Sequence, residues 1–324
     1  MQYTRHILLP SGGIEYSDFA EVTPFNVGTI LSLSNNFYLA SDSEMMLNIL
    51  SQHVKNLNVL DMYYADCCYV WQFLYNQAMS KASQENVLIT NTLCKKCGKE
   101  HAIKTPLDKL AIKYLKKSDS NTLTKIFKFS SVGKVHVTRR FRKLKDNINT
   151  SYSIMNSEET SAFKQVEDII GFIKQQIVSV DFENKRFHLD GNDKLFDDFI
   201  FSLKIYEILE LFEFFRIDDF GILNDMLFEC IDCKKENQLI FFDAFSSSHF
   251  FTKGMPDDNF QKTIQNIMSI KSSGYMNFKE ICEIEYNMFD LYMEAITKAI
   301  KAKGGKPNDG GSPFEGSLLG DALQ

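Results

Sequence analysis

The residues most able to do chemistry in this chain are four cysteines arranged as two CxxC pairs. The first pair is Cys94 and Cys97, in LCKKCGKEH, and the second pair is Cys230 and Cys233, in FECIDCKKENQ. Each CxxC spacing suits a zinc knuckle, and two knuckles together supply the four thiolates of a closed tetrahedral site. The sequence therefore predicts one zinc ion bound by all four cysteines.

A CxxC motif can also carry out thiol–disulfide exchange, or it can be an ordinary surface turn. The redox interpretation requires a pair that opens a helix after a strand, and neither pair has that setting. Short apolar runs precede and follow each pair, which favours two hairpins with a knuckle at each tip. If the pairs lie in unrelated surface turns, the four cysteines never meet.

A zinc ion held by four cysteines has no open position for water or substrate, so the predicted role is structural rather than catalytic. Structural zinc binding contributes about 10–16 kcal/mol, whereas closing the loop over residues 98–229 costs roughly 4 kcal/mol. Such a site can hold distant parts of the chain together. His101 follows the first pair closely enough to be a spare ligand.

The composition indicates an ordered protein from a reducing compartment. The chain has 324 residues, a net charge of -6 and seven cysteines. Cys67, Cys68 and Cys282 lie in apolar helical patterns, where a thiol behaves as a small hydrophobic group. No apolar run of 18 residues and no signal-peptide pattern occurs, so we expect a soluble intracellular protein with no membrane contact.

The apolar periodicity predicts an α+β fold: a mainly helical body with short β-hairpins, and a zinc-ribbon-like module formed by the two distant CxxC knuckles. Residues 1–40 read as strands, Ser43–Val54 as a helix and 58–80 as a second, largely buried helix. Further helices are predicted over 105–117, 161–178, 197–217, 259–273 and 276–303, and hairpins over 125–144 and 180–191.

Composition divides the chain into four segments. Residues 1–115 hold the N-terminal strands, the helix pair and the first knuckle, and residues 116–160 a basic strand pair and a polar loop, a candidate insertion. Residues 161–302 form a helical part with the second knuckle. Residues 303–324 are rich in Gly, Pro and Ser, which predicts a flexible tail whose few apolar residues can dock on a partner.

Charge is distributed unevenly. Basic residues predominate from Lys104 to Lys145, and acidic residues from Asp181 to Glu229. The basic segment 134–145 mixes aromatic residues with Arg139, Arg140 and Arg142, which is typical of a nucleic-acid surface. A patch for a protein partner, or a solvated or internally paired surface, explains the same pattern.

Motifs of catalysis are absent from the sequence. It contains no phosphate-binding glycine loop and no HExxH, GxSxG or SxxK motif. Glu207, Glu210 and Glu213 form an acidic stripe that we interpret as the solvated face of a helix rather than as an acid–base pair. We therefore predict that the protein is not an enzyme.

Several short motifs occur in a characteristic order. LPSGG at Leu9–Gly13 is followed by Tyr16, then by CxxCG at Cys94–Gly98 and, after the second CxxC pair, by SSSHFF ending at Phe251. Together with DKL at 108–110, ELFEFF at 210–215 and ICEIEYNMFDLYMEAI at 281–296, this order resembles the baseplate hub family of contractile-tailed bacteriophages, which includes the hub assembly protein of T-even phages. Residues 115–195 match poorly, the tail is unmatched, and Lys234 stands where the first knuckle has Gly98.

The resemblance implies a structural or assembly role in the baseplate hub, through contacts with other phage tail and baseplate proteins. The protein would then be found in the virion tail baseplate, or in the host cytoplasm during assembly. The residues alone also allow a zinc-ribbon regulatory protein that binds nucleic acid through segment 134–145.

Overall fold

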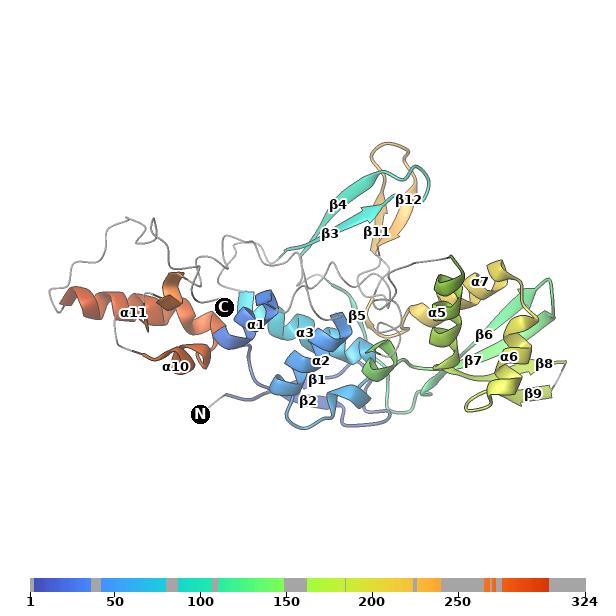
Figure 1. Cartoon of the computed structure of the whole chain (residues 1–324), viewed down its shortest axis with the longest axis horizontal. Coiled ribbons are helices and arrows are strands. Elements are labelled where there is room, and N and C mark those ends of the chain that lie inside the picture. Colours follow the sequence, from blue (N-terminus) through green and yellow to red (C-terminus); the bar gives the residue numbers. More distant parts are fainter. Residues whose placement is uncertain are drawn as a thin grey trace.

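The computed structural model describes residues 3–35, 42–79, 87–106, 110–148, 162–183, 185–223, 226–239, 265–268, 270–271 and 276–302. The tail 303–324, the SSSHFF segment and most of the helix predicted over 259–273 lie outside these residues. The described chain mixes helices with small antiparallel sheets (Figure 1), which is compatible with the predicted α+β class. No helix in this part of the chain is long and apolar enough to cross a membrane.

The N-terminal body is built on a buried helix. Strands β1 (Arg5–Leu8) and β2 (Phe19–Val22) pair antiparallel beside α2 (Asp42–His53) and α3 (Tyr64–Met79). The short 3-10 helix η2 (Val59–Asp61) precedes α3. Trp71 and Leu74 of α3 are almost fully buried in the core cluster of this body. The predicted helices over 43–54 and 58–80 are thus confirmed, with a break before Tyr64.

The strand prediction for residues 1–40 is wrong over Val27–Asn35, which form helix α1. Asn26 starts this helix, because its side-chain oxygen accepts hydrogen bonds from the Thr29 backbone N–H at 2.8 Å and the Thr29 hydroxyl at 2.9 Å. Val27 is fully buried in a cluster with residues of the C-terminal helices. The cap and this long-range packing together outweigh the strand preference of a segment rich in branched residues.

The C-terminal helix predicted over 276–303 is interrupted. It consists of α10 (Phe278–Cys282), the 3-10 helix η4 (Tyr286–Met288) and α11 (Phe289–Ala302). Between α10 and η4 the backbone bonds to the segment before α1, through Val27 N to Ile284 O and Tyr286 N to Phe25 O, both at 2.9 Å. Those bonds replace the helical ones.

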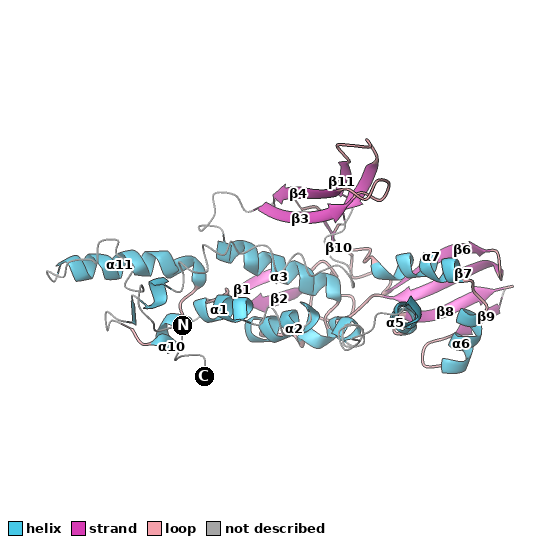
Figure 2. Ribbon diagram, turned by 45° about the horizontal axis from the view of Figure 1, so that its top comes forward, coloured by secondary structure: helices cyan, strands magenta, loops and turns pink. Residues whose placement is uncertain are grey.

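A second unit contains a four-stranded antiparallel sheet with the order β6 (Thr122–Phe129), β7 (Gly133–Arg140), β8 (Ile177–Phe182) and β9 (Lys185–His188). Its apolar face packs against α5 (Ala162–Lys174), α6 (Asp193–Phe201) and α7 (Ile205–Arg216) in one buried cluster (Figure 2). Both predicted hairpins are confirmed. Because β7 pairs with β8, the expected boundary at residue 160 falls inside this unit.

The helix predicted over 197–217 is two helices, α6 and α7, and Glu207 is not part of a solvated stripe. Glu207 is 1% exposed. Its carboxylate accepts hydrogen bonds from the backbone N–H and hydroxyl groups of Ser130 and Ser131, in the β6–β7 turn, and from the Lys204 backbone N–H. Glu207 therefore begins α7 and also holds the hairpin turn against it, while Glu210 and Glu213 are exposed as predicted.

The second unit is connected to the body by two adjacent strands. The chain enters it after β5 (Ile112–Lys113) and leaves it through β10 (Gly221–Ile222), and these two strands pair antiparallel. The predicted helix over 105–117 is therefore wrong where the chain is described, since β5 bonds to β10 and Leu115 N donates to Pro10 O at 2.8 Å. A Cβ on Gly221 would lie 2.9 Å from Ala65 Cβ, so β10 runs close against α3.

The LPSGG motif lies at this connection. Gly12 has φ of +63°, and a Cβ there would lie 2.1 Å from the Leu115 carbonyl oxygen, so only glycine fits. The Ser11 backbone N–H donates to buried Asp66 of α3 at 3.0 Å, and the Tyr16 hydroxyl donates to the same carboxylate at 2.6 Å. Burial raises the pKa of Asp66 to about 6, although these two hydrogen bonds favour its carboxylate.

We expect Tyr16→Phe to lower the free energy of unfolding by about 1–3 kcal/mol. The Tyr16 hydroxyl also accepts from the Tyr63 backbone N–H at 2.7 Å, so its loss leaves two buried groups unpaired. Urea unfolding of the variant and of Tyr3→Phe, at a residue 66% exposed, provides a matched comparison. Equal midpoints for both variants would contradict this assignment.

We also expect Glu207 to make the protein sensitive to acid. Burial opposes its ionisation, but the hydrogen bonds from Ser131, Lys204 and Ser130 prevail and lower its pKa from 4.5 to about 2. A lowered carboxyl pKa stabilises the folded state above pH 4.5, and that stabilisation is lost as the pH falls toward 2. Glu207→Gln should therefore flatten the fall of unfolding free energy over this range, whereas Glu210→Gln should leave it steep. Parallel curves for the two variants would show that Glu207 is not the group responsible.

Candidate metal centre

Two hairpins carry the four cysteines. The first pairs β3 (Val87–Leu93) with β4 (Glu100–Pro106), and the second pairs β11 (Met226–Glu229) with β12 (Glu236–Leu239). They precede β5 and follow β10, on either side of the second unit, and Figure 1 shows them projecting together from the body. The arrangement of hairpin, knuckle and hairpin expected from the sequence is confirmed.

The two turns have the same backbone geometry. In the first, Gly98 N donates to Cys94 O at 2.8 Å, and in the second, Lys234 N donates to Cys230 O at 3.0 Å. Both turns need a residue with positive φ, which is +70° at Gly98 and +55° at Lys234. Lys234 thus adopts the left-handed conformation that glycine adopts without steric cost, and the departure from CxxCG leaves the turn intact.

The four sulfur atoms converge. The sulfurs of Cys94, Cys97, Cys230 and Cys233 all lie within 4.8 Å of one another. The short contacts cross between hairpins: Cys94 Sγ is 3.5 Å from Cys233 Sγ, and Cys97 Sγ is 3.6 Å from Cys230 Sγ. Tetrahedral zinc with Zn–S bonds of about 2.3 Å requires sulfur–sulfur distances of about 3.8 Å. The donor set and its spacing therefore fit a structural metal ion.

The cysteine thiols of the cluster do not ionise equally. Backbone hydrogen bonds from Cys97 and Lys96, together with the neighbouring thiols of Cys233 and Cys97, lower the pKa of Cys94 to about 6 although burial opposes its ionisation. For Cys233, a backbone hydrogen bond from Lys235 favours the thiolate, but burial and the contacts with Cys94 and Cys230 outweigh it and raise the pKa to about 12. One thiolate therefore hinders the next, and a divalent cation removes that conflict.

Asn237 of β12 braces the first knuckle from the second hairpin, and no spacing rule in the sequence indicates it. Its side-chain oxygen accepts from the Lys95 backbone N–H at 3.0 Å, and its amide nitrogen lies 3.6 Å from Cys94 Sγ. The Lys96 backbone N–H also points to Cys94 Sγ at 3.4 Å. N–H groups directed at sulfur stabilise a metal-bound thiolate and fix its position.

His101 contacts the cluster through one cysteine only. Its Nε2 lies 3.2 Å from Cys230 Sγ, and His101, Cys230 and Asp232 form a second group of close donor atoms. Asp232 is ion-paired with Lys99 at 2.7 Å. The spare-ligand candidate of the sequence thus lies beside the four-sulfur group, where its N–H can donate to the Cys230 thiolate.

Of the arginines predicted for nucleic-acid contact, two are buried and the third is held in an ion pair. Arg139 and Arg142 are 1% and 0% exposed, and Arg142 pairs with Asp218 at 2.5 Å. Arg140 is held by both oxygens of Asp146, at 2.8 and 2.9 Å. The guanidinium groups pack on aromatic rings instead, since Arg142 lies 4.2 Å from the centre of the Tyr64 ring and Arg139 lies 4.9 Å from that of Phe214.

This burial explains part of the uneven charge. Asp218 and Asp219 belong to the acidic segment and pair with Arg142 and Lys113 of the basic segment, the latter at 3.0 Å. The two segments thus attract one another at the junction between the body and the second unit.

Comparison with known protein families, curated proteins and solved structures finds no match to this chain.

We expect Cys94→Ser to abolish tight metal binding and to lower the thermal midpoint. A loss of about 2 kcal/mol of stability corresponds to a fall of roughly 3 °C in the midpoint for 324 residues, at about 2.1 cal/mol/K of unfolding entropy per residue. Cys282→Ser, outside the cluster, serves as the control and should retain both the metal and the sensitivity of its midpoint to a chelator. An unchanged melting curve for Cys94→Ser, with or without chelator, would mean that the thiolates do not stabilise the fold.

Proposed function

We propose that this chain is a structural or assembly protein of a bacteriophage tail baseplate hub, and that it acts through protein contacts with a fold held by one structural zinc ion. The observation that carries the structural part of the proposal is the convergence of four cysteine sulfurs from hairpins far apart in the sequence. Such a closed donor set holds chain segments together and leaves no ligand position for substrate.

The choice of zinc follows from the donors. Four thiolates in tetrahedral spacing favour zinc over the hard cations magnesium and calcium, which prefer oxygen. The two hairpins with their knuckles then constitute a zinc-ribbon-like module, in which Asn237 and His101 support the sulfurs from outside.

The baseplate role rests on the order of motifs in the sequence, and the contacts that two of these motifs make with distant parts of the chain are in keeping with a structural role. Ser11 of LPSGG and Tyr16 both bind Asp66 of α3, and Gly12 lies against Leu115 just after β5. The two CxxC pairs meet at the cluster. LPSGG and the two CxxC pairs thus each make contacts that join distant parts of the chain, which supports a structural role.

The alternative of a nucleic-acid-binding regulator receives no support from Arg139 and Arg142, because both side chains are buried. Binding of nucleic acid by Arg142 itself would require loss of its ion pair with Asp218.

Cross-linking tests the proposed role. The tagged full-length chain is purified from cells that produce it from its native genome, and its cross-linked partners are identified by mass spectrometry. We expect tail or baseplate proteins, in complexes that survive nuclease treatment. A chain that stays free of tail proteins, or whose complexes disappear with nuclease or with rising salt, would contradict the proposal.

A further inference from the structure

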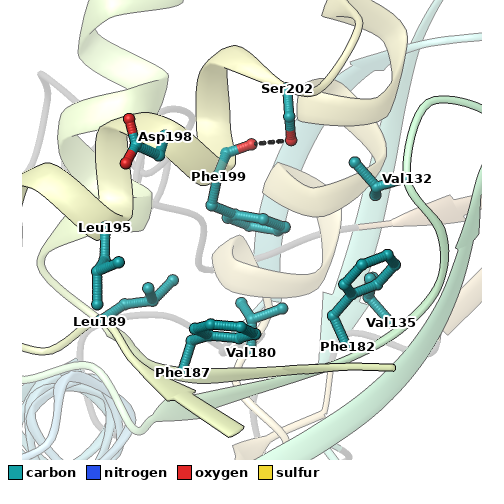
Figure 3. A pocket seen from close by; sticks show the side chains of 10 residues that line it. All are labelled: Val132, Val135, Val180, Phe182, Phe187, Leu189, Leu195, Asp198, Phe199 and Ser202. Carbon is teal, nitrogen blue, oxygen red and sulfur yellow. Dashed lines mark hydrogen bonds between the residues drawn. The ribbon is translucent and has the colours of Figure 1, made fainter. Parts of the chain in front are cut away.

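The second unit contains an apolar cavity that neither the metal centre nor the proposed role uses. Its volume is about 280 Å³, and it lies between the β8–β9 end of the sheet and α6 (Figure 3). Every side chain that lines it is apolar except Asp198 and Ser202. The Ser202 hydroxyl already donates to the Phe199 carbonyl oxygen at 2.5 Å. An apolar cavity of about 150 Å³ holds a benzene-sized molecule, so this one has room for a large apolar side chain.

The cavity is open to solvent at a rim that includes Phe187 of the edge strand as well as the exposed residues Asp198 and Ser202. Val135, Val180 and Leu189 form its buried floor and are 1–4% exposed, whereas Phe187 is 38% exposed. Figure 3 shows Phe187 and Leu189 below the cavity and the α6 residues Leu195 and Phe199 across from them. Phe187 belongs to β9, so the edge strand itself forms one side of the opening.

Strand β9 has one free edge. Within the described part of the chain it pairs only with β8, all four of its residues are exposed, and no backbone hydrogen bond leads from it to another segment. A strand edge with unpaired N–H and C=O groups readily accepts an extended peptide as a further strand.

The register of β9 specifies which peptide would fit. Phe187 lies opposite Val180, and Lys185 opposite Phe182, so Phe187 and Lys185 share the face that borders the cavity. Lys185 is exposed and makes no ion pair with any described residue. A strand added beside β9 would place one side chain next to Phe187 and another, two positions away, next to Lys185.

We propose that β9 and the adjoining cavity bind an extended peptide segment of a partner protein. The segment adds to the sheet through backbone hydrogen bonds, inserts a large apolar side chain between Phe187 and α6, and places an acidic side chain two positions away against Lys185. A small apolar molecule would use the cavity but neither the strand edge nor Lys185. This inference is independent of the metal and of the baseplate role.

The test is selection of random short peptides, displayed on yeast, by the purified full-length chain. The expected result is enrichment of peptides with a large apolar residue and an acidic residue two positions apart. Lys185→Glu should change the selected residue from acidic to basic, because the charge that faces the peptide is reversed. The fold should be kept, since Lys185 is an exposed residue of the edge strand. Lys194→Glu, an equal charge change on α6 at a residue that does not line the cavity, should leave the selected pattern unchanged.

A second variant tests the cavity itself. Leu195→Trp places a larger side chain in the cavity and should lower the affinity of the enriched peptides by about tenfold or more, as expected when an anchoring side chain loses its pocket.

The proposal would be overturned by a selection without enrichment, by enriched peptides that lack the pattern, or by a Lys185→Glu chain that still selects acidic residues. Binding of an apolar dye such as anilinonaphthalene sulfonate without any peptide enrichment would assign the cavity to small molecules and would also overturn it.

Discussion

Mutual repulsion among four close thiolates governs the link between the two hairpins. Cys94, Cys97, Cys230 and Cys233 bring their sulfurs within 4.8 Å, and such a group cannot ionise fully without a cation between its members. The cluster is unfavourable without a metal ion, and a bound ion removes the repulsion. Because the site forms only in the folded chain, the free energy of metal binding adds to the free energy of folding. Asn237 directs its amide N–H at the Cys94 sulfur, and the His101 ring nitrogen Nε2 lies 3.2 Å from the Cys230 sulfur, where it can donate to a thiolate.

The topology shows why this link is possible at low entropic cost. An entire unit, from β6 to α7, is inserted between the two hairpins, so a metal site alone would have to close a very long loop. The pairing of β5 with β10 already brings the two ends of that insertion together, and the close approach of Gly221 to Ala65 holds them against α3. The hairpins emerge from neighbouring points, and the metal only has to join their tips. Ion pairs from Arg142 and Lys113 to Asp218 and Asp219 strengthen the same junction.

The features that the sequence predicts correctly are those with a local signature. The CxxC spacing indicated all four cysteines of the cluster, the turn near Gly133 indicated the β6–β7 hairpin, and the apolar periodicity indicated α2, α3 and α5. The failures have a common cause, which is that distant contacts decided the local structure. Residues 27–35 became helical through a cap and packing on the C-terminal helices, and β5 became a strand because β10 lies beside it.

The burial of charged residues was predicted wrongly for the same reason. Arg139, Arg142 and Glu207 are charged residues, which are usually exposed, but here each is buried against a hydrogen-bond partner. These partners lie more than seventy positions away in the sequence, so local patterns do not indicate them. Asn237 could not be identified either, since its partner is the opposite hairpin.

The most direct test of the central claim is X-ray absorption at the zinc edge of the purified full-length chain. We expect one zinc per chain with four sulfur neighbours at about 2.3 Å, which would place the ion among the two cysteine pairs and leave His101 outside its coordination sphere. A chain without zinc, or a zinc ion with three sulfurs and one nitrogen, would contradict a four-thiolate link between the two hairpins.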